Sequence, residues 1–471
     1  MLRPWKVDIR LDYNADKAIY LQIADAIISA IQIGRLKSGD ALPGSRNMAE
    51  MLHVNRNTVV EALNVLLNEE WIVSKERKGA FVADVLPISH RNKRSLSEQR
   101  NIVPPTLCRI SFDDGYPDTK IAPVTELARA YKQIFNRNAR WQILGYGNEL
   151  GDAAFRNAIG QMLNQQRGMH INSESICITR GSQMAMYLTA QCLISKGDCI
   201  VIENPGYKPA WKAFEAAGAR LLPVRVDSEG LVIEDVIRHL RSSRRIKAIY
   251  TTPHHQYPTT VTLSLQRRLA LIRLSNEYGF TVIEDDYDNE FHFGYRPVLP
   301  LSSFPELQHF VYIGTMSKVV APALRIGYVA GNDTSLIEKI GALRKIIDVQ
   351  GDSIMEQAVL QLIADGTIKK HVKKATLHYK ARRDLTQSLL DRYLKGKADY
   401  HLPDGGLAIW LQPVAKVDWQ ALAQKLLRKG IKMLPPDFYH GESETTGMRL
   451  GYGALGEEEL EEGIKALAKL L

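Results

Sequence analysis

The chain has 471 residues, 45% of them hydrophobic and 24% charged, which is the balance of a folded globular protein. Its length predicts two or three domains. The net charge of +9 is weak support for nucleic-acid binding, since residues 1–95 hold 14 Lys and Arg against 11 Asp and Glu. No apolar run approaches the roughly 20 residues of a membrane helix, and residues 1–10 lack the apolar core of a signal peptide. We therefore expect a cytoplasmic protein.

The cysteines have neither the spacing of a metal site nor that of a disulfide framework. There are four of them: Cys108, Cys177, Cys192 and Cys199. Three lie in apolar segments, which favours buried free thiols in a reducing compartment. His254 and His255 have no cysteine or carboxylate at ligand spacing, so we expect no metal site.

Three helix signals follow one another near the N-terminus. Isoleucines recur at helical spacing over residues 20–34, where a glycine ends the pattern. A short second helix follows, with Ser45 as its expected N-cap. A third helix is predicted from Arg56 to about Asn68, with Asn55 as its cap.

Two apolar strands, over residues 71–75 and 79–83, follow the third helix and flank a basic turn. Three helices and such a wing predict a winged helix-turn-helix, whose recognition helix enters the major groove of DNA by its first turn. Arg56 and Asn57 on that turn suit base edges. Residues that suit DNA phosphates are Arg46, Thr58, Lys75, Arg77 and Lys78. The alternative is a small helical protein-interaction domain with solvated charges.

Residues 18–83 resemble the GntR-type DNA-binding domain. The matching stretches are Gly39–Pro43, Ser45–Arg46, Arg56–Val59 and Lys78–Val82. Gly44 stands where this family often has serine. The resemblance implies that double-stranded operator DNA is a partner.

A change of composition separates this module from the rest of the chain. Residues 86–109 are polar and basic, then proline-bearing, as in an interdomain tether. We therefore expect a DNA-binding domain over residues 1–85 and a second domain over 110–471. Its large lobe should span about 110–369 and its small lobe about 370–471.

From residue 110 onward apolar strands alternate with helical segments, which predicts an α/β fold. The expected sheet is largely parallel, seven-stranded and covered by helices on both faces. Its strands are predicted at Ile176–Thr179, Cys199–Glu203, Arg220–Val224, Ile246–Thr252, Thr281–Asp285, His309–Ile313 and Arg325–Ala330. After about residue 370, a long helix, a strand at 405–411 and a helix at 457–471 indicate a small α+β lobe.

The stretch from Gly314 to Gly327 carries the strongest chemical signal. Lys318 follows a buried strand at its carboxyl end, where open α/β sheets hold ligands. Its amine can form a Schiff base with a cofactor aldehyde, and the neighbouring Thr315, Ser317 and Arg325 suit a phosphate. The alternative is a surface lysine in a polar loop.

Other strand ends add suitable partners. Residues 181–183 begin a helix whose free N–H groups suit a phosphate, with a plain helix cap as the alternative. Tyr207 has a ring that can stack on a planar cofactor. A buried carboxylate at Asp285 requires a cation such as a protonated pyridine nitrogen. Tyr287 can donate to a phenolic oxygen, and Arg449 can fork onto a carboxylate.

Together these residues resemble the fold-type-I pyridoxal-phosphate aminotransferases. The resemblance implies pyridoxal 5'-phosphate as the cofactor and Lys318 as the catalytic Schiff-base lysine. It implies that Asp285 partners the pyridinium, that Tyr207 stacks on the ring and that Tyr287 meets the ring oxygen. The phosphate would be surrounded by Gly181, Ser182, Gln183, Thr315, Ser317 and Arg325.

The resemblance also implies two effector contacts and one departure. Arg449 would receive an α-carboxylate, and Tyr146 would be lent by the neighbouring subunit. Aminotransferases of this class carry Asn-Pro-Thr-Gly after the fourth strand, whereas this chain has Tyr257 at the Asn position and Thr260 at the Gly position. We expect cofactor binding at a site that includes Tyr257, with at most partial or slow transamination.

A GntR-like winged helix followed by an aminotransferase-like body resembles the MocR/GabR-type transcriptional regulators. This implies a regulator that binds pyridoxal phosphate and senses an amine, an amino acid or the vitamer. It also implies a head-to-tail, domain-swapped homodimer. Two alternatives remain: a catalytically active aminotransferase with an appended DNA-binding module, and a DNA-binding protein whose body has lost the cofactor.

Overall fold

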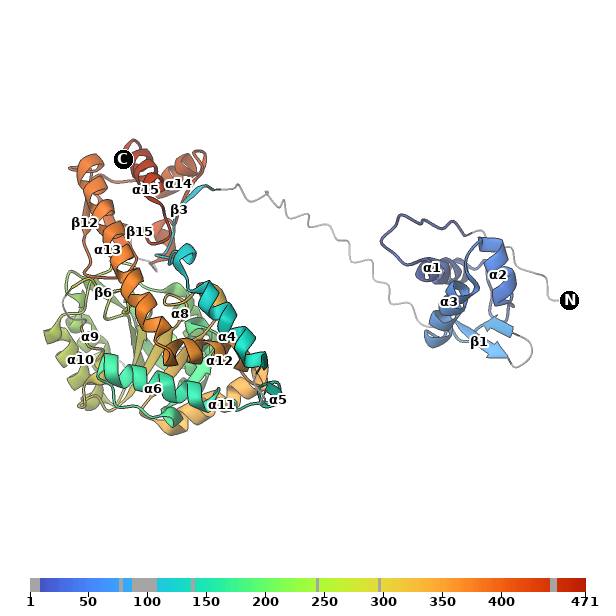
Figure 1. Ribbon diagram of the computed structural model, residues 1–471, viewed down its shortest axis with the longest axis horizontal. Helices are drawn as coiled ribbons and strands as arrows, with labels where there is room; N and C mark the ends of the chain where they lie inside the picture. Colours follow the sequence, from blue (N-terminus) through green and yellow to red (C-terminus); the bar gives the residue numbers. More distant parts are fainter. Residues whose placement is uncertain are drawn as a thin grey trace. The chain divides into compact units, whose positions relative to one another are not determined.

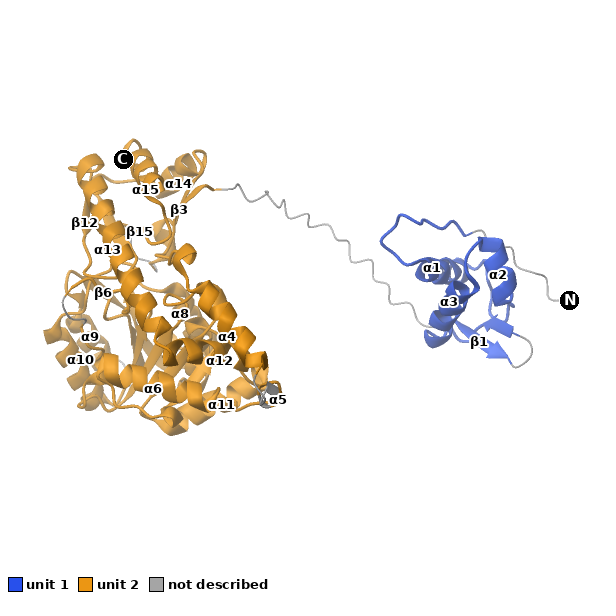
Figure 2. Ribbon diagram, in the orientation of Figure 1, with its two compact units in different colours: residues 1–102 blue, residues 103–471 orange. Residues whose placement is uncertain are grey.

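The computed structural model describes residues 9–75, 79–86, 108–136, 140–242, 245–294, 298–440 and 447–471. The chain forms two compact units, Met1–Ile102 and Val103–Leu471 (Figure 2).

The first unit is a winged helix-turn-helix, as predicted (Figure 1). Its three helices bury a common apolar core in which Ile27, Val59 and Leu66 are fully covered. The two strands of the wing pair antiparallel. Its elements are α1 (Ile19–Gln32), α2 (Ser45–Leu52), α3 (Arg56–Asn68), β1 (Ile72–Lys75) and β2 (Gly79–Val82).

The helix caps in this unit explain the turn between α2 and α3. His53 ends α2 in the left-handed conformation, with φ of 53°. The Asn55 side chain then accepts the backbone N–H of Asn57, as expected of an N-cap. The expectation for Ser45 was wrong: Gly44 is the N-cap of α2, because its backbone is still extended whereas Ser45 is already helical.

A sheet organises the second unit, in the spatial order β4-β11-β10-β9-β8-β5-β6-β7. Strands β6, β5, β8, β9 and β10 are parallel to one another, while β11 runs antiparallel to both β10 and β4. All seven predicted strands are present, and β7 adds a short eighth strand at one edge. The strands are β4 (Ile176–Thr179), β5 (Cys199–Asn204), β6 (Arg220–Asp227), β7 (Gly230–Leu231), β8 (Ile246–Thr251), β9 (Thr281–Asp286), β10 (Phe310–Thr315) and β11 (Gly327–Gly331).

Helices cover both faces of this sheet. Successive side chains of a strand point to opposite faces, so Val201 of β5 packs into one core while Ile200 and Ile202 pack into the other. One face carries α7 (Ser182–Leu193), α8 (Lys208–Ala216) and α11 (Thr334–Asp348). The other carries α4 (Val124–Asn136), α6 (Ala153–Arg167), α9 (Ile233–Ser242), α10 (Leu265–Tyr278) and α12 (Ser353–Ala364). The short helix α5 (Arg140–Ile143) follows α4.

A smaller α+β lobe follows. It contains the antiparallel sheet β12-β13-β15 and three helices. Sequence order placed residues 110–112 in the large lobe, but β3 pairs with β14 and buries Ile110 and Phe112 in the core of the small lobe. The elements are β3 (Ile110–Phe112), α13 (Thr367–Tyr393), β12 (Ala398–His401), β13 (Ala408–Pro413), α14 (Trp419–Leu427), β14 (Ile431–Met433), β15 (Met448–Gly451) and α15 (Glu457–Ala468).

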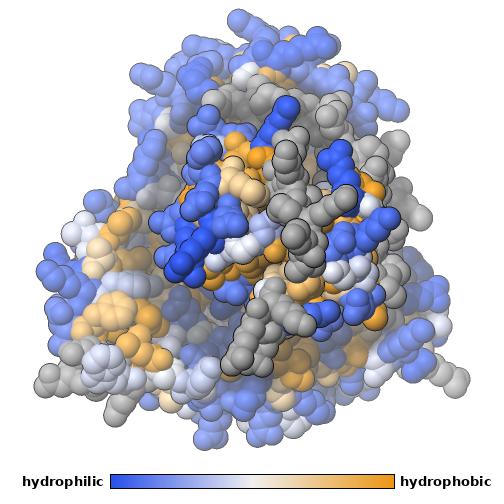
Figure 3. Space-filling view, turned by 90° about the vertical axis from the view of Figure 1, so that its right-hand side faces the viewer, coloured by the Kyte–Doolittle hydropathy of each residue, from blue (hydrophilic) through white to orange (hydrophobic). Residues whose placement is uncertain are grey.

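The surface is mixed in polarity. Hydrophilic and hydrophobic residues both reach it on the face seen in Figure 3. Large exposed apolar side chains of the second unit include those of Trp141, Leu144, Tyr146 and Ile346. Among the helices of the described residues, none has the length and apolar character needed to cross a membrane.

Candidate functional site

A pocket opens where the carboxyl ends of the central strands meet. The loops after β4, β5, β8, β9 and β10 each contribute to it, which is the usual ligand site of an open α/β sheet. Predicted residues in its wall are Ser182, Tyr207, Tyr257, Asp285, Tyr287, Thr315, Ser317, Lys318 and Arg325. The wall also contains residues that were not predicted for the site: Asp114, Tyr116, Pro117, Met186, Thr252 and Pro322.

Lys318 lies three residues beyond β10 and is half-buried. Its Nζ donates to the backbone oxygen of Gly115 and lies 5.6 Å from the ring centroid of Tyr116. Burial lowers the pKa of Lys318 from its ordinary value of 10.5, although nearby carboxylates, first Asp288, oppose the shift. A larger fraction of neutral amine at neutral pH makes this lysine a better nucleophile.

Asp285 lies near the end of β9 and is 4% exposed. The Tyr250 hydroxyl donates to its Oδ2 at 2.8 Å, and Oδ1 has no partner within the described part of the chain. Burial raises the pKa of Asp285 to about 7, against the opposing effect of the Tyr250 hydrogen bond. A buried carboxylate with one free oxygen is a site for a cationic N–H group.

The turn between β4 and α7 forms an anion site with Arg325. Gly181 has φ of 80°, and a Cβ there would lie 2.5 Å from Nη2 of Arg325, so only glycine lets the guanidinium approach the turn. Ser182 begins α7 and presents the N-terminal end of the helix dipole. The Ser317 hydroxyl is buried and has no described partner. Backbone N–H groups, a guanidinium and a free hydroxyl together suit a phosphate.

Two tyrosines shape the wall above the sheet. The rings of Tyr207 and Tyr257 meet edge to face, with centroids 5.1 Å apart. The Tyr257 hydroxyl donates to Oδ1 of Asp114 at 2.8 Å. Gly181 and Gln183 flank the wall residue Ser182 in the sequence. Oε1 of Gln183 accepts a hydrogen bond from the Tyr207 hydroxyl at 3.4 Å. Tyr257, which stands at the usual asparagine position, is therefore hydrogen-bonded to Asp114 of the loop after β3.

Arg449, on β15, is buried behind the pocket wall and is 1% exposed. Its guanidinium donates to the backbone oxygens of Asp114 (3.2 Å) and Pro258 (3.0 Å) and to the Tyr287 hydroxyl (3.3 Å). Tyr146 is 91% exposed and is not part of this wall. The structure thus brings the predicted cofactor residues together and places Arg449 against two of them, Tyr257 and Tyr287, whereas Tyr146 lies outside the wall.

The loop after β3 was not among the predicted site residues, because β3 has only three residues and lies more than 200 positions before Lys318 in the sequence. A signal was present: Asp113, Asp114 and Gly115 form a polar turn after an apolar strand, as at the other strand ends. The Asp113 carboxylate accepts the backbone N–H groups of Gly115 and Tyr116, both at 2.8 Å. This turn carries Asp114 and Tyr116 into the pocket.

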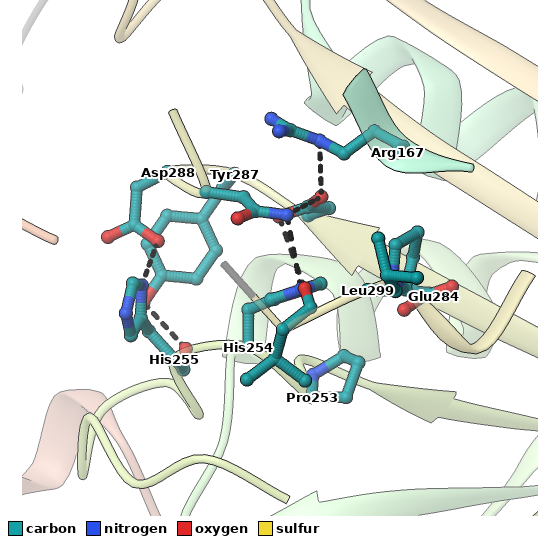
Figure 4. A network of polar contacts seen from close by, with 12 residues as sticks. Arg167, Pro253, His254, His255, Glu284, Tyr287, Asp288 and Leu299 are labelled. Atoms are coloured by element: carbon teal, nitrogen blue, oxygen red, sulfur yellow. Dashed lines mark hydrogen bonds and ion pairs between the residues drawn. The ribbon is translucent and has the colours of Figure 1, made fainter. Parts of the chain in front are cut away.

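A buried polar network holds the segment after β9 (Figure 4). Asp286 lies 3.7 Å from Nε of Arg167 and 3.6 Å from Nδ1 of His254, and it accepts the Asn289 amide at 3.1 Å. The Tyr287 hydroxyl donates to the backbone oxygen of His255 at 2.8 Å. These contacts fix the backbone that carries Asp285 and Tyr287.

The adjacent histidines have separate acidic partners. His255 Nδ1 lies 2.7 Å from the Asp288 carboxylate (Figure 4). Burial alone would lower the pKa of His255, but Asp288 outweighs it and raises the pKa. For His254, burial lowers the pKa to about 4. No cluster of three or more metal-ligating side chains occurs among the described residues.

The DNA-binding candidates of the first unit face solvent. Arg56 and Asn57, on the first turn of α3, are exposed, as are Arg46 on α2 and Lys75 at the end of β1. Thr58 is half-buried. Nε of Arg56 donates to the Ser45 hydroxyl at 3.4 Å, and Nζ of Lys75 lies 5.0 Å from the Phe81 ring centroid. Arg77 and Lys78 lie outside the described residues.

The chain belongs to the aminotransferase class I and II family, which matches residues 109–467, and residues 19–82 match the gntR family of bacterial regulatory proteins. This combination is that of the MocR-type regulators. The chain is 28% identical to the probable rhizopine catabolism regulatory protein MocR of Rhizobium meliloti, over 97% of this chain and 94% of that protein. It is 26% identical to the HTH-type transcriptional regulator TauR of Rhodobacter capsulatus, over 96% of each.

A solved structure agrees with this assignment. Pyrococcus horikoshii kynurenine aminotransferase, solved in complex with PMP, superposes with a TM-score of 0.72 and 27% identity over 77% of this chain and 90% of that one. Aminotransferases of this fold are dimeric and use pyridoxal 5'-phosphate, and a gntR-type domain implies DNA binding. The pocket fits this cofactor, because it offers the Lys318 amine, a free Asp285 oxygen and the phosphate site at Arg325.

Proposed function

We propose that this protein is a transcriptional regulator whose pyridoxal-phosphate pocket senses a primary amine, an amino acid or the vitamer. The observation that carries the proposal is the presence, in one chain, of an exposed recognition-helix terminus and a complete cofactor pocket. An effector that favours one arrangement of the protein changes its affinity for DNA by that preference.

Each side chain of the pocket has a task in this proposal. When bound, pyridoxal phosphate supplies an aldehyde carbon to which primary amines add. Lys318, as a neutral amine, competes with the amine of the effector for that carbon. Asp285 holds the ring nitrogen, Tyr207 covers the ring, and Arg325 holds the phosphate with the residues around it. To donate to the ring oxygen, the Tyr287 hydroxyl would exchange its present acceptor, the backbone oxygen of His255.

Further partners belong to the proposal as well. The body pairs with a second copy, and we expect the exposed Tyr146 loop to reach the partner's pocket in a head-to-tail, domain-swapped dimer. Arg449 is the candidate for an effector carboxylate, and it would have to exchange its present acceptors for that role. We also propose domain limits of 1–85 and 110–471 with a tether over 86–109, and a cytoplasmic location.

The test is operator binding by the cofactor-loaded protein with and without a panel of amines and amino acids. An effector should change the DNA dissociation constant by about 5–150-fold, the usual range of allosteric coupling. Lys318→Ala should keep effector-free DNA binding and lose the amine response. An amine response that survives in Lys318→Ala would contradict the proposed role of this lysine.

A working aminotransferase is the second candidate, and the complete set of Lys318, Asp285 and Arg325 favours it. Tyr257 disfavours it, since its hydroxyl is held by Asp114. Steady turnover between an amino acid and a keto acid at about 10 per second would establish the enzyme reading. At most a single or slow turnover is expected.

A further inference from the structure

We infer that a groove behind the cofactor pocket is a second ligand site, and that it takes an amphiphilic amine, which is an apolar chain or ring ending in one ammonium group. Binding in the groove is communicated to Lys318 through a loop that the groove and the pocket share. The communication rests on the proposed function, whereas binding in the groove does not depend on it.

The groove is formed by three helices and two loops of the large lobe. Helix α12 packs against both α6 and α13 (Figure 1), and the loops after β9 and β10 complete a cavity of about 780 Å³. This volume is in the usual range of small-molecule sites, whose lining is mostly apolar. Apolar side chains that line the groove include Met162, Met316, Val319, Leu360, Ile363 and Val372.

The groove lies directly behind the residue that would hold the cofactor. Met316 and Val319 line the groove, while Ser317 and Lys318 between them line the cofactor pocket. These residues form one hydrogen-bonded turn, in which the backbone N–H of Val320 donates to the backbone oxygen of Met316 at 2.9 Å. A ligand that packs against Met316 and Val319 supports this turn. It therefore favours the arrangement in which Lys318 occupies the aldehyde carbon.

Glu290 gives the groove its preference for a cation. The described charged side chains in the lining are those of Glu290, which is 14% exposed, and Lys369, which is exposed. Nη2 of Arg167 donates to Oε1 of Glu290 at 3.0 Å, but Nε of the same guanidinium lies 3.7 Å from Asp286 (Figure 4). One positive charge is therefore shared by two carboxylates.

The neighbouring basic groups do not balance this cluster. Burial lowers the pKa of His254, which lies beside Asp286, to about 4, so His254 is neutral at neutral pH. The Arg268 guanidinium attracts Asp286, but it interacts more strongly with a third buried carboxylate, Glu284. Three carboxylates and two guanidiniums leave one negative charge, and Glu290 is the member that reaches the groove. A ligand cation beside Glu290 would supply the missing counter-charge.

A matched pair of probes tests the site. N,N-dimethylhexylamine is a tertiary amine, so it cannot add to the cofactor aldehyde as a primary amine does. N,N-dimethylhexanamide has the same chain and dimethylamino end without the charge. Calorimetric titration of the full-length, cofactor-loaded protein at pH 8 measures binding, since burial raises the pKa of Glu290 to about 7 and the group is ionised at pH 8. The amine should bind about tenfold more tightly than the amide, as one charge-assisted hydrogen bond provides.

Three substitutions locate the site. Glu290→Gln keeps an acceptor for Arg167 and removes the charge, so the preference for the amine should fall to near one. Asp365→Asn removes an exposed carboxylate from the turn between α12 and α13, outside the lining, and should retain the preference. Ala158→Trp fills the groove from α6 and should abolish binding of both probes.

Methylamine measures the communication with Lys318. Its affinity is read from the absorbance of the cofactor, with and without saturating N,N-dimethylhexylamine. The methylamine concentration needed should rise about fivefold, at the lower end of allosteric coupling. In Glu290→Gln, the same probe concentration should raise it much less.

The outcomes are distinguishable. Equal binding of the two probes, or a preference that persists in Glu290→Gln, overturns the cation site. Failure of both probes to bind also overturns it, and a changed oligomeric state of Ala158→Trp would then make the groove an interface between copies of the chain. An unchanged methylamine affinity at probe saturation overturns the communication. If methylamine alone leaves the absorbance unchanged, the proposed amine sensing fails, whereas calorimetry still decides whether the groove binds.

Discussion

Asp285 links folding to cofactor binding at the level of a single residue. Its carboxyl group is buried with one free oxygen, and burial raises its pKa from 3.8 to about 7 in the folded protein. Folding of the cofactor-free protein therefore carries a cost that is absent at low pH, develops between about pH 4 and 7, and is complete above the folded pKa. A cationic ring nitrogen beside Asp285 would remove that cost.

The substitution Asp285→Asn tests this linkage. The amide keeps an acceptor for Tyr250 and cannot ionise, so the cofactor-free variant should be more stable than the parent at pH 8 by up to about 4 kcal/mol. The gain should be much smaller at pH 5. Free energies of unfolding at both pH values measure it, and an equal gain at both would show that charge is not the cause. The same variant should bind pyridoxal phosphate more weakly.

Gly181 shows a requirement for a specific backbone at one position. Its φ is 80°, and the Cβ of an alanine there would lie only 2.5 Å from Nη2 of Arg325, so the substitution would strain the backbone and displace the guanidinium. Gly181→Ala should weaken cofactor binding by about tenfold or more, since displacement of the Arg325 guanidinium removes a charge-assisted contact to the phosphate.

Fluorescence or absorbance titration of the cofactor-free protein measures this change. Gly279→Ala is the matched control. Gly279 is also left-handed, at φ of 71°, but a Cβ there meets nothing within 4 Å. It should lose stability and keep cofactor affinity, so equal affinities of the two variants would contradict the steric argument at Gly181.

At the scale of elements, α3 and the wing divide the tasks of DNA recognition. Arg56 lies on the first turn of α3, whereas Lys75 ends β1 and lies near the tip of the wing. Arg56→Ala should lose about 1–3 kcal/mol at the preferred site and relax base preference at one position. Lys75→Ala should weaken all sequences alike and reduce the salt dependence by about one unit. Binding to specific and scrambled duplexes over a range of salt separates the two, and equal losses on both would make Arg56 a phosphate contact.

At the scale of the whole molecule, each unit has its own closed core. The core of the first unit draws on residues 23–82, and the cores of the second unit draw on residues 110–468. Units with separate cores fold separately. A chain cut to residues 103–471 should therefore fold, bind pyridoxal phosphate and lose DNA binding.

Absorbance of the bound cofactor and DNA titration of the shortened chain measure these properties. Cofactor affinity should stay within about threefold of that of the full chain. A shortened chain that is soluble and helical but does not bind the cofactor would indicate that the first unit completes the pocket.

Local sequence signals determined the elements of this protein. Isoleucine spacing placed α1, and Asn55 marked the start of α3, because helical periodicity and capping act within a few residues. The alternation of strands and helices determined the parallel sheet. Since parallel strands bring their carboxyl ends to one edge, residues as distant as Ser182 and Arg325 could be predicted to meet.

Tertiary structure alone decided which groups complete the pocket. The pairing of β3 with β14 brings Asp114 and Tyr116 to Lys318, and no local pattern encodes a contact between segments so far apart. The same packing buries Arg449 against Pro258 and Tyr287, so the carboxylate role predicted for it depends on the exchange of these hydrogen-bond acceptors. A residue's type sets what it can bind, whereas burial and hydrogen-bond partners, which depend on the whole fold, decide whether it is free to do so.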